Sequence, residues 1–501
     1  MWLALSALVV GVGCEASKYG KAADDEVYGI LDSRRQSVLG DTNQFRIGTD
    51  ISRRPVGDVN GSEIVRSQYA NGERVLTLED ALEQAVKANR TYQFNREKLY
   101  LQALSLTSTR HQFALKFTTA SVDMGLERKS NGGLGGNSDA DLTLQRIFKT
   151  GGKVTATLAN DLVLYFDGKP KVPSITLALS QPLLRGAGAE MAAEILTQAE
   201  RDVIYEVREF SHFQEEFAVD VIRDYYSLLQ QGEDLRLTYN NYTNRIFFRQ
   251  EIEARVRAGL SAEFEAKQAF EAEYSSKLSY IRSTNTYQNS LDVYKQKLNL
   301  PLGEQLKLDF TTLEALKQFG LPSVPLTDRM GYRLAITNRL DILNEVDKFE
   351  DTKRKVKVAK NELLPSFSIV ADAALKDQFY SSFQPEDFTA NAGLKLDLPL
   401  DQLAERNAYR QSLINFERAL RALATKLDQL RDGIRSDVRN LSQQRENYYT
   451  RMEALKNAEE NLLATRQRLR LGFPGVRTRD IITALDSLLQ AQQSVSQAIV
   501  D

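Results

Sequence analysis

The chain has little cysteine, histidine, tryptophan or proline, and no excess of either charge. Its 501 residues include one Cys, two His, one Trp and 11 Pro, with 65 Lys+Arg against 67 Asp+Glu. A single Cys excludes a disulfide scaffold and a cysteine-rich metal site. Two isolated histidines leave too few ligands for a His-based metal centre, so we expect no metal and no cofactor. The near-neutral charge argues against nucleic-acid binding, which requires a basic face.

No apolar run is long enough for a membrane-spanning helix, which needs about 20 residues. The run WLALSALVVGVG near the N-terminus has the length of a signal-peptide core, and it ends directly before Cys14. A Cys after Gly13 resembles a bacterial lipoprotein signal, although no Lys or Arg precedes the run and Gly11 stands where that signal usually has Leu. We therefore interpret 1–14 as a leader. Three alternatives remain open. Cys14 is lipidated, a signal peptide is removed without lipidation, or the segment is not a signal at all.

The low proline content is compatible with long uninterrupted helices. The chain also contains two related halves. TLEDALEQAVKANR (77–90) corresponds to LTDRMGYRLAITNRLDILN (326–344), with Asn338 in the place of Asn89, an offset of 249. Near the ends of the halves, Gly472 corresponds to Gly259, an offset of 213. The first half therefore carries about 36 additional residues between these anchors, and the two halves are internal repeats.

Both repeats have the same order of elements: a helix, strands, a very long helix, a turn and another helix. The polar segment 15–74 precedes them and is predicted to be extended. The first repeat, 75–325, is predicted to contain a helix at 77–112, strands within 113–184, a long helix at 187–257, a helix at 261–300 and a linker at 301–325. The second repeat, 326–501, is predicted to contain a helix at 327–362, strands within 364–400, a long helix at 402–471 and a helix at 478–501.

The two longest predicted helices have about 70 residues each, which corresponds to roughly 105 Å. Their apolar residues recur at alternating steps of three and four, from Leu413 to Leu469 and from Leu196 to Leu228. This spacing is typical of a coiled-coil seam. A helix on an ordinary domain core would be shorter and would have a wider apolar face. We therefore predict a mainly α protein built on long antiparallel coiled-coil helices.

The predicted strands alternate apolar and polar residues, so each has one apolar and one polar face. Either a soluble sandwich or a membrane β-barrel fits this pattern. Each half has too few strands to close a barrel, and open edges are not tolerated in lipid, so a barrel would require several chains. The surplus of the first repeat reads as two further strands within 138–166, and the sequence leaves open whether they join the barrel. In the segment 388–400, the polar face carries three candidate lumen residues: Asn391, Lys395 and Asp397.

Taken together, these segments resemble the TolC-like outer-membrane efflux protein family over about residues 75–501. Three kinds of segment carry the resemblance. They are the opening helix quoted above, the strand-to-helix passages PSITLALSQPLLRGAGAE (173–190) and LKLDLPLDQLAERNAY (394–409), and the two helix–turn–helix ends. It implies a homotrimer in which each chain gives four strands to a shared 12-stranded barrel in outer-membrane lipid. It also implies a periplasmic tunnel of coiled coils whose tip contacts a periplasmic adaptor protein. The adaptor would couple the channel to an inner-membrane pump of the RND, ABC or MFS type.

The resemblance places adaptor docking at the two turns of the tip. The matching residues are Arg255, Gly259, Leu260, Glu263 and Glu265 in the first turn, and Arg468, Leu469, Gly472, Thr478 and Asp480 in the second. Glycine at such a turn allows the left-handed cap that ends a helix. The acids suit the N-terminal dipole of the following helix, so capping and docking remain alternative roles for Glu265 and Asp480.

The predicted function is therefore passive transport. We expect an outer-membrane channel subunit of a tripartite efflux or type I secretion system in a Gram-negative-type bacterium. No pair of acids or Ser/His/Asp set stands out, so we expect no catalytic residue and no enzymatic activity. The alternative is a periplasmic coiled-coil structural or adaptor protein without a channel. An adaptor, however, should have a single helical hairpin between β-rich modules.

Overall fold

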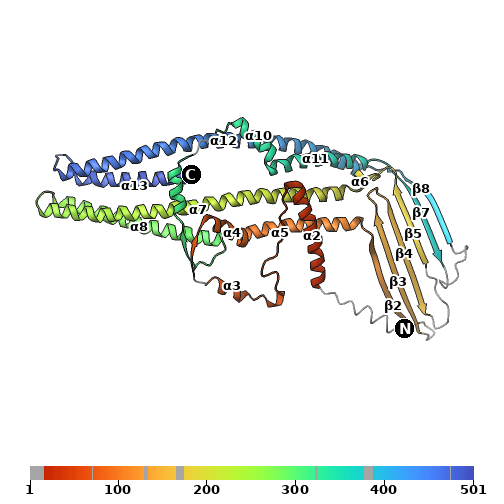
Figure 1. Cartoon of the computed structure of the whole chain (residues 1–501). Helices are drawn as coiled ribbons and strands as arrows, with labels where there is room; N and C mark the ends of the chain where they lie inside the picture. Colours follow the sequence, from red (N-terminus) through yellow and green to blue (C-terminus); the bar gives the residue numbers. More distant parts are fainter. Residues whose placement is uncertain are drawn as a thin grey trace. The chain divides into compact units, whose positions relative to one another are not determined.

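The computed structural model describes residues 16–69, 72–128, 134–164, 174–321, 325–376, 388–473 and 475–501 (Figure 1). The chain forms two compact units, which are described separately. Unit 1 contains Met1–Arg46, Glu97–Phe210 and Asn338–Leu427. Unit 2 contains Ile47–Arg96, Ser211–Thr337 and Asp428–Asp501. Three helices run from one unit into the other: α5 (Arg90–Phe113), α7 (Glu194–Arg257) and α12 (Leu403–Arg470).

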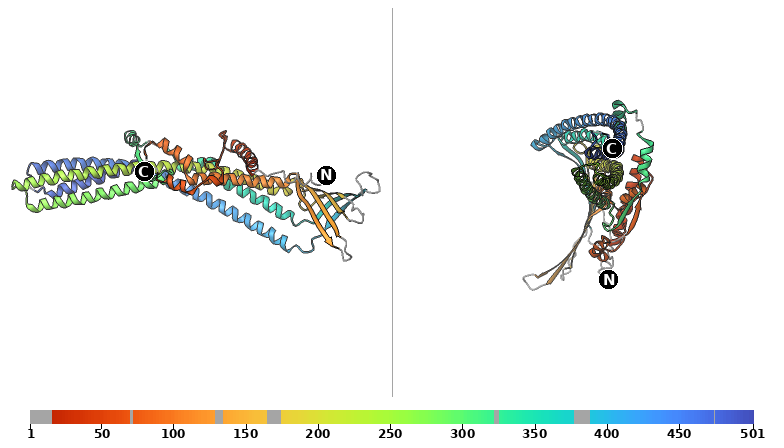
Figure 2. Two further views of the ribbon diagram at one scale, coloured as in Figure 1. Left: turned by 90° about the horizontal axis from the view of Figure 1, so that it is seen from below. Right: turned by 90° about the vertical axis from the view of Figure 1, so that its left-hand side faces the viewer.

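Unit 1 contains a six-stranded sheet with the order β2-β3-β4-β5-β7-β8, and every neighbouring pair is antiparallel. The strands are β2 (Lys116–Arg128), β3 (Leu134–Ile147), β4 (Lys153–Leu164), β5 (Ser174–Pro182), β7 (Ser366–Lys376) and β8 (Phe388–Asp397). The sheet therefore has six strands, where the resemblance to the TolC-like family implies four. Figure 2 shows it as a single curved layer.

Helices flank the sheet at the points where the repeats enter and leave it. α5 leads into β2, and β5 leads through α6 (Ala189–Ala192) into α7. In the second repeat, α11 (Leu340–Asn361) leads into β7, and β8 leads into α12. Leu99, Leu106 and Val203 are almost completely buried among these helices. β3 and β4 have no helix of their own.

Unit 2 is built on two helical hairpins, α7 with α8 (Glu263–Lys297) and α12 with α13 (Thr478–Val500). Beside them, β1 (Glu73–Leu76) and β6 (Gln305–Leu308) form a parallel pair. The remaining elements are η1 (Val56–Asp58), α3 (Gly61–Ser67), α4 (Leu78–Ala88), α9 (Thr311–Phe319) and α10 (Asp328–Asn338). Among the helices described, none combines the length and apolarity needed to cross a membrane.

The predicted single helix at 77–112 is wrong, because the structure has α4 and α5 with a break at Asn89. Asn89 takes an extended backbone (ψ 130°). Its side chain accepts a hydrogen bond from the backbone N–H of Tyr92 (2.8 Å) and donates one to the carbonyl of Lys297 (2.7 Å). An asparagine side chain competes in this way with the backbone bonds of a helix and caps the next one.

The second repeat breaks at the matching place, so the predicted helix at 327–362 is also two helices, α10 and α11. Arg339 is extended (ψ 115°), and its guanidinium binds Asp341 at 2.8 Å. The predicted helix at 187–257 is interrupted as well, because Ala193 leaves helical geometry (φ −100°, ψ 12°) between α6 and α7.

The segment 15–74 is not extended throughout, because it contains α2 (Ala16–Leu39), η1, α3 and β1. Val27, Ile30 and Leu31 follow helical spacing and are buried in unit 1. The hydroxyl of Tyr100 donates to Asp24 at 2.7 Å, which fixes α2 on α5. The predicted linker at 301–325 likewise contains β6 and α9. These elements are short or carry few apolar residues, so the sequence shows no sustained periodicity there.

Candidate functional site

Each helical hairpin of unit 2 ends in a turn that starts with the same backbone cap. In the first turn, Gly259 has a φ of 71°, and the N–H of Leu260 donates to the carbonyl of Arg255 at 2.8 Å. In the second turn, Gly472 also has a φ of 71°, and the N–H of Phe473 donates to Arg468 at 3.1 Å. These are Schellman caps, which require a residue that tolerates a left-handed backbone.

The two turns differ after the glycine. In the first, α8 starts at Glu263, whose side chain is 81% exposed and lies 3.7 Å from Lys267. In the second, Gly475 has a second positive φ (100°) before α13 starts. The carboxylate of Asp480 accepts a hydrogen bond from the N–H of Arg477 at 2.8 Å. Asp480 therefore caps α13 in this structure, which is one of the two roles that the sequence leaves open.

A buried apolar cluster joins the two hairpins behind the turns. It contains Phe248, Ile252, Ala269, Leu469, Ile481 and Leu485. Two residues that sequence reasoning assigned to docking are part of this interior: Leu469 is 7% exposed and Thr478 only 1%. Their side chains serve packing. Two ion pairs also link the hairpins: Arg470 on α12 lies 3.4 Å from Glu251 on α7, and Arg245 on α7 binds Asp486 on α13.

The outer surface of the turns carries large apolar side chains. Leu260 and Phe264 are 69% and 58% exposed, and Leu471 and Phe473 are 74% and 55% exposed. Each turn thus presents two of them. Sequence reasoning named only Leu260, because Phe264, Leu471 and Phe473 do not match the family pattern. Their position outside the apolar seam of the flanking helices was the available signal. Four exposed apolar groups on one pair of turns are typical of a protein-contact surface.

The candidate lumen residues lie on one face of the sheet. The Asn391 amide donates to the carboxylate of Asp372 on β7 at 3.0 Å. Lys395 and Asp397, two positions apart on β8, form an ion pair at 3.2 Å. Asn391, Lys395 and Asp397 therefore share one face of β8, but only Lys395 and Asp397 contact each other. Cys14, the candidate lipidation site, lies outside the described residues.

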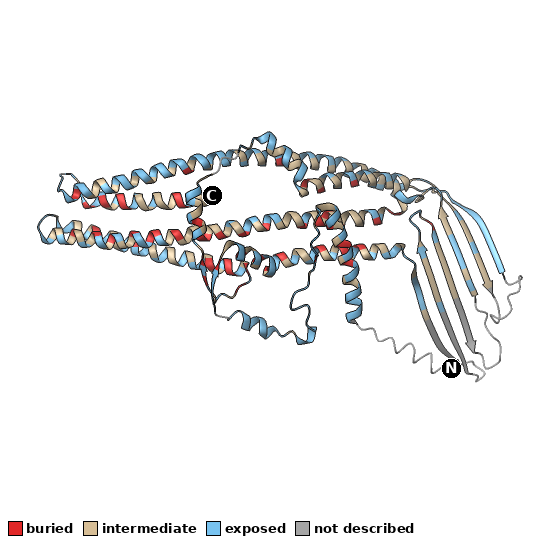
Figure 3. Cartoon of the chain, viewed as in Figure 1, coloured by how far each residue is buried: buried red, intermediate tan, exposed pale blue. Residues whose placement is uncertain are grey.

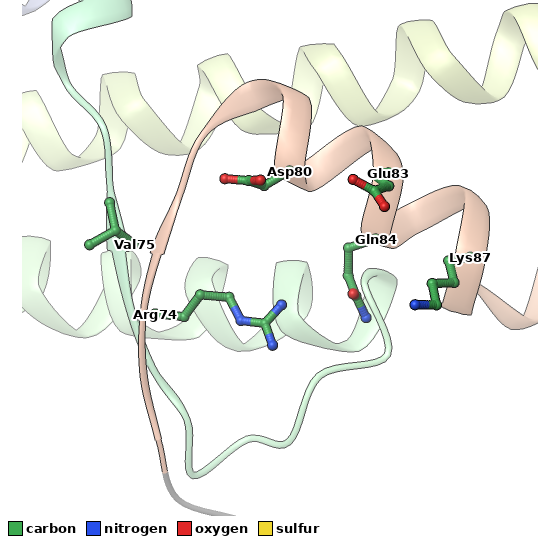
Figure 4. A pocket seen from close by; sticks show the side chains of 6 residues that line it. All are labelled: Arg74, Val75, Asp80, Glu83, Gln84 and Lys87. Atoms are coloured by element: carbon green, nitrogen blue, oxygen red, sulfur yellow. The ribbon is translucent and has the colours of Figure 1, made fainter.

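A shallow pocket in unit 2 gathers charged side chains that sequence reasoning did not single out. Figure 4 shows the residues that line it: Arg74, Val75, Asp80, Glu83, Gln84 and Lys87. Two of its charged side chains, Arg74 and Asp80, already have structural partners. Arg74 pairs with Glu304 at 2.9 Å, and hydrogen bonds from Thr77 hold the pKa of Asp80 below its usual value. Over the described residues, no group of three or more His, Cys, Asp or Glu could hold a metal ion.

Comparison with known proteins links this architecture to outer-membrane channels. No family model and no curated protein matches the sequence. Among solved structures, CusC, described as forming a transmembrane channel, has a TM-score of 0.61 at 12% identity, over 84% of this chain and 88% of CusC. The outer-membrane protein VceC of Vibrio cholerae has a TM-score of 0.58 at 13% identity, over 84% and 92%.

The open-state outer-membrane channel MtrE of Neisseria gonorrhoeae has a TM-score of 0.55 at 12% identity, over 84% of this chain and 85% of MtrE. Identities this low show a shared fold. The matches also span most of both chains. The chain therefore has the fold of the TolC-like outer-membrane channels, which is the fold that the resemblance in its sequence implies.

Proposed function

We propose that the chain is a subunit of an outer-membrane channel that passively conducts substrates out of the cell. The observation that carries the proposal is the six-stranded sheet of unit 1. One of its faces is apolar and the other polar, and β2 and β8 lie at its ends. A sheet of this kind is stable in lipid only when its ends are paired. Pairing between copies of the chain satisfies that requirement, and the likeness to CusC, VceC and MtrE supports it.

The proposed assembly is a homotrimer in the outer membrane of a Gram-negative-type bacterium. A periplasmic adaptor and an inner-membrane pump of the RND, ABC or MFS class complete an efflux or type I secretion system. Asn391, Lys395 and Asp397 then line the lumen. A lipid on Cys14 would add a second attachment to the membrane, and mass spectrometry of the N-terminal peptide tests for its thioether-linked acyl glycerol.

Membrane fractionation and light scattering test the channel proposal. We expect the protein in the outer-membrane fraction, extracted only by detergent, with the mass of three chains. Recovery from the soluble periplasm without detergent would favour the alternative, a periplasmic coiled-coil structural or adaptor protein. A monomeric mass after gentle extraction would contradict the shared barrel.

Adaptor docking is proposed for the outer surface of the two tip turns. Its centre is the exposed apolar set Leu260, Phe264, Leu471 and Phe473, with Arg255, Glu263, Glu265 and Arg468 beside them. In this proposal, Gly259 and Gly472 shape the turns through their left-handed backbone, and Asp480 caps the start of α13. Leu469 and Thr478 then support the turns from inside.

Substitution at the tip distinguishes docking from folding. Leu260→Asp with Leu471→Asp should abolish cross-linking to the adaptor and efflux, while the trimer still forms, because both side chains are exposed. The matched control is Lys277→Asp, an exposed site on α8 further from the turn, which should retain docking. Charge reversal at Glu263 tests the electrostatic part separately. Unchanged cross-linking in the double leucine variant would overturn the assignment.

A further inference from the structure

Among the residues that the structure describes, the β3–β4 hairpin of unit 1 has no counterpart in the second repeat. β2 follows α5 as β7 follows α11, and β5 precedes α7 as β8 precedes α12. These four strands correspond between the repeats. β3 and β4 are therefore an additional pair inserted into the first repeat between β2 and β5.

The additional pair lies inside the sheet. β3 is paired with β2 from Lys116↔Gln145 to Arg128↔Leu134, and β4 is paired with β5 from Lys153↔Ser180 to Ala159↔Ser174. β3 and β4 also pair with each other along most of their length. A flap folded outside the wall would leave β2 beside β5. Here β2 reaches β5 only through β3 and β4.

In three adjacent rows that cross all six strands, both faces of the sheet keep their chemistry across the hairpin. On one face, residues in register form two wholly apolar rows over all six strands. One row is Phe117, Leu144, Ala156, Leu177, Ala373 and Ala390, and the other is Ala120, Leu142, Leu158, Ile175, Leu375 and Phe388.

The opposite face carries a row of hydroxyls. It consists of Thr119, Thr143, Thr157, Thr176 and Thr389, and only β7 interrupts it, with Ala374 between Thr176 and Thr389. Thr143 and Thr157, both on the hairpin, are hydrogen-bonded to each other through their side chains at 3.3 Å. The hairpin strands thus present the same apolar and polar surfaces as the four strands that correspond between the repeats, and they must face the same two media.

The turn of the hairpin is packed on the passage from β5 into α7. A Cβ placed on Gly151 would lie 2.6 Å from the carbonyl oxygen of Gly186, so only glycine fits this approach. The carbonyl of Thr150 accepts hydrogen bonds from the N–H of Gly188 and from the side chain of Gln181, each at 3.2 Å. This fixes the hairpin in register at both its long edges and its turn.

We propose that the β3–β4 hairpin is part of the channel wall, so that the assembled barrel has 18 strands in place of the 12 that the family resemblance implies. The inference rests on the proposed trimer, since three chains with six strands each give 18. Because barrel diameter grows roughly linearly with strand number, the lumen is about 1.5-fold wider than that of a 12-stranded barrel. Barrels of about this size hold an aqueous passage. The pore therefore accepts bulkier polar cargo, past a collar of threonine hydroxyls.

Paired single cysteines test this placement in the membrane. Thr143→Cys and Leu144→Cys are adjacent on β3 and face opposite sides, and Thr176→Cys and Leu177→Cys are the matched control pair on β5. The reagent is a water-soluble maleimide applied to outer-membrane vesicles, and the unsubstituted chain gives the background from Cys14. We expect labelling at both threonine positions and loss of labelling at both leucine positions.

The control pair distinguishes this inference from the proposed function. Equal labelling of Thr143→Cys and Leu144→Cys, with the β5 pair still different, would place the hairpin outside the wall and overturn the inference alone. Equal labelling of both pairs would instead contradict the membrane channel itself. If a β3 variant fails to assemble, Thr157→Cys and Leu158→Cys provide the same comparison on β4. Electron cryo-microscopy of the detergent-extracted trimer supplies the direct count, and a 12-stranded wall would overturn the proposal.

Discussion

The two long helices of the repeats are alike in sequence pattern and very different in burial. α7 has 64 residues and α12 has 68, and both carry apolar residues at coiled-coil spacing. In α7, Val203, Val221 and Leu229 are completely buried. In α12, only Leu430, Tyr448 and Leu469 are buried, while Leu420 and Leu441 are 49% and 52% exposed. Figure 3 shows the contrast along the two helices.

This difference shows that apolar periodicity predicts a helix face that packs on a partner, but not which partner covers it. Other helices of the same chain cover α7: α2, α5 and α11 contact it in unit 1, and α8 and α13 contact it in unit 2. Much of the α12 seam is left exposed by the part of the chain that the structure describes. In the proposed trimer a neighbouring copy covers it, so the two helices should respond differently to substitution.

The largest expected effect is on assembly through α12. Leu441→Asp places a carboxylate on the exposed seam, and burying that charge at a helix contact costs several kcal/mol. We expect loss of the trimer, measured by light scattering of the detergent extract, with helical content retained. Asn440→Asp adds the same charge at the neighbouring exposed position and should leave the trimer intact. Full assembly of Leu441→Asp would show that no partner covers this seam.

A core substitution in α7 should act on the fold of the single chain. Leu229 is 0% exposed, and Leu229→Ala should lower the free energy of unfolding by about 3 kcal/mol because it leaves a cavity. Its counterpart on the exposed seam, Leu420→Ala, should cost the monomer less than about 1 kcal/mol. Urea denaturation of the dissociated chain, followed by circular dichroism, measures both. Equal losses would remove the distinction between the helices.

A buried ionic network holds α7 to α11 in unit 1. Asp351 is 3% exposed and accepts from the Tyr205 hydroxyl (2.6 Å), Arg201 (2.5 Å) and Arg354 (2.6 Å). Burial by itself raises the pKa of Asp351, but the hydrogen bonds from Tyr205 and Arg354 and the two nearby cations bring it below its usual value.

Asp351→Asn should therefore destabilise unit 1 by about 2 kcal/mol at pH 7, allowing for the partial exposure of both arginines. A lowered pKa means that the carboxylate stabilises the fold above its unfolded-state pKa and loses that effect as pH falls through the lowered value. The difference between variant and parent should accordingly shrink in strong acid. Glu350→Gln, which removes an exposed pair with Lys353, is the control and should change the melting temperature little. An equal change in both variants would deny the network its role.

The smallest effect concerns an acid that lies along the seam of α7. Burial, and then the charge of Glu233, raise the pKa of Asp234 to about 6, and its Oδ1 is buried without a partner. The protonated form is favoured by the fold, so this contribution is full below about pH 4 and is lost as pH rises through 6. Asp234→Asn should thus stabilise the chain by about 1 kcal/mol at pH 8 and have no effect at pH 4.

Thermal melts at the two pH values measure this change. Asp220→Asn, at an exposed position of the same helix paired with Arg223, is the control and should show no such pH dependence. A gain at pH 4 equal to that at pH 8 would contradict the assignment to the ionised carboxylate.

Much of the fold follows from local pattern. Alternation of apolar and polar residues identified the strands within each repeat. Apolar residues at steps of three and four identified the long helices. Gly259 and Gly472 marked the turns, because a left-handed cap is a local requirement of the backbone. The breaks at Asn89 and Arg339 were missed, since an asparagine side chain interrupts a helix only when partners such as the Lys297 carbonyl are present. α2 and α9 were missed for a related reason. They have few apolar residues, and these stabilise a helix only by packing on other parts of the chain.

At the candidate site, sequence reasoning located the turns but not the roles within them. Leu469 and Thr478 matched the family pattern, yet the structure buries both, and Asp480 caps its helix. Phe264, Leu471 and Phe473 are exposed and matched no pattern. Whether a side chain near a turn faces inward depends on the crossing of four helices, which a linear motif does not encode.

The sequence by itself determined the duplication, the type of each long element, the two-faced strands and the surplus of about 36 residues, because these depend on spacing along the chain. Only the tertiary structure decided that the surplus hairpin lies within the sheet and which tip residues are accessible. It also decided that the apolar seam of α7 is buried while much of the α12 seam is exposed. The physical reason is that a period fixes the faces of an element, whereas register, partner and burial are set by contacts between residues far apart in sequence.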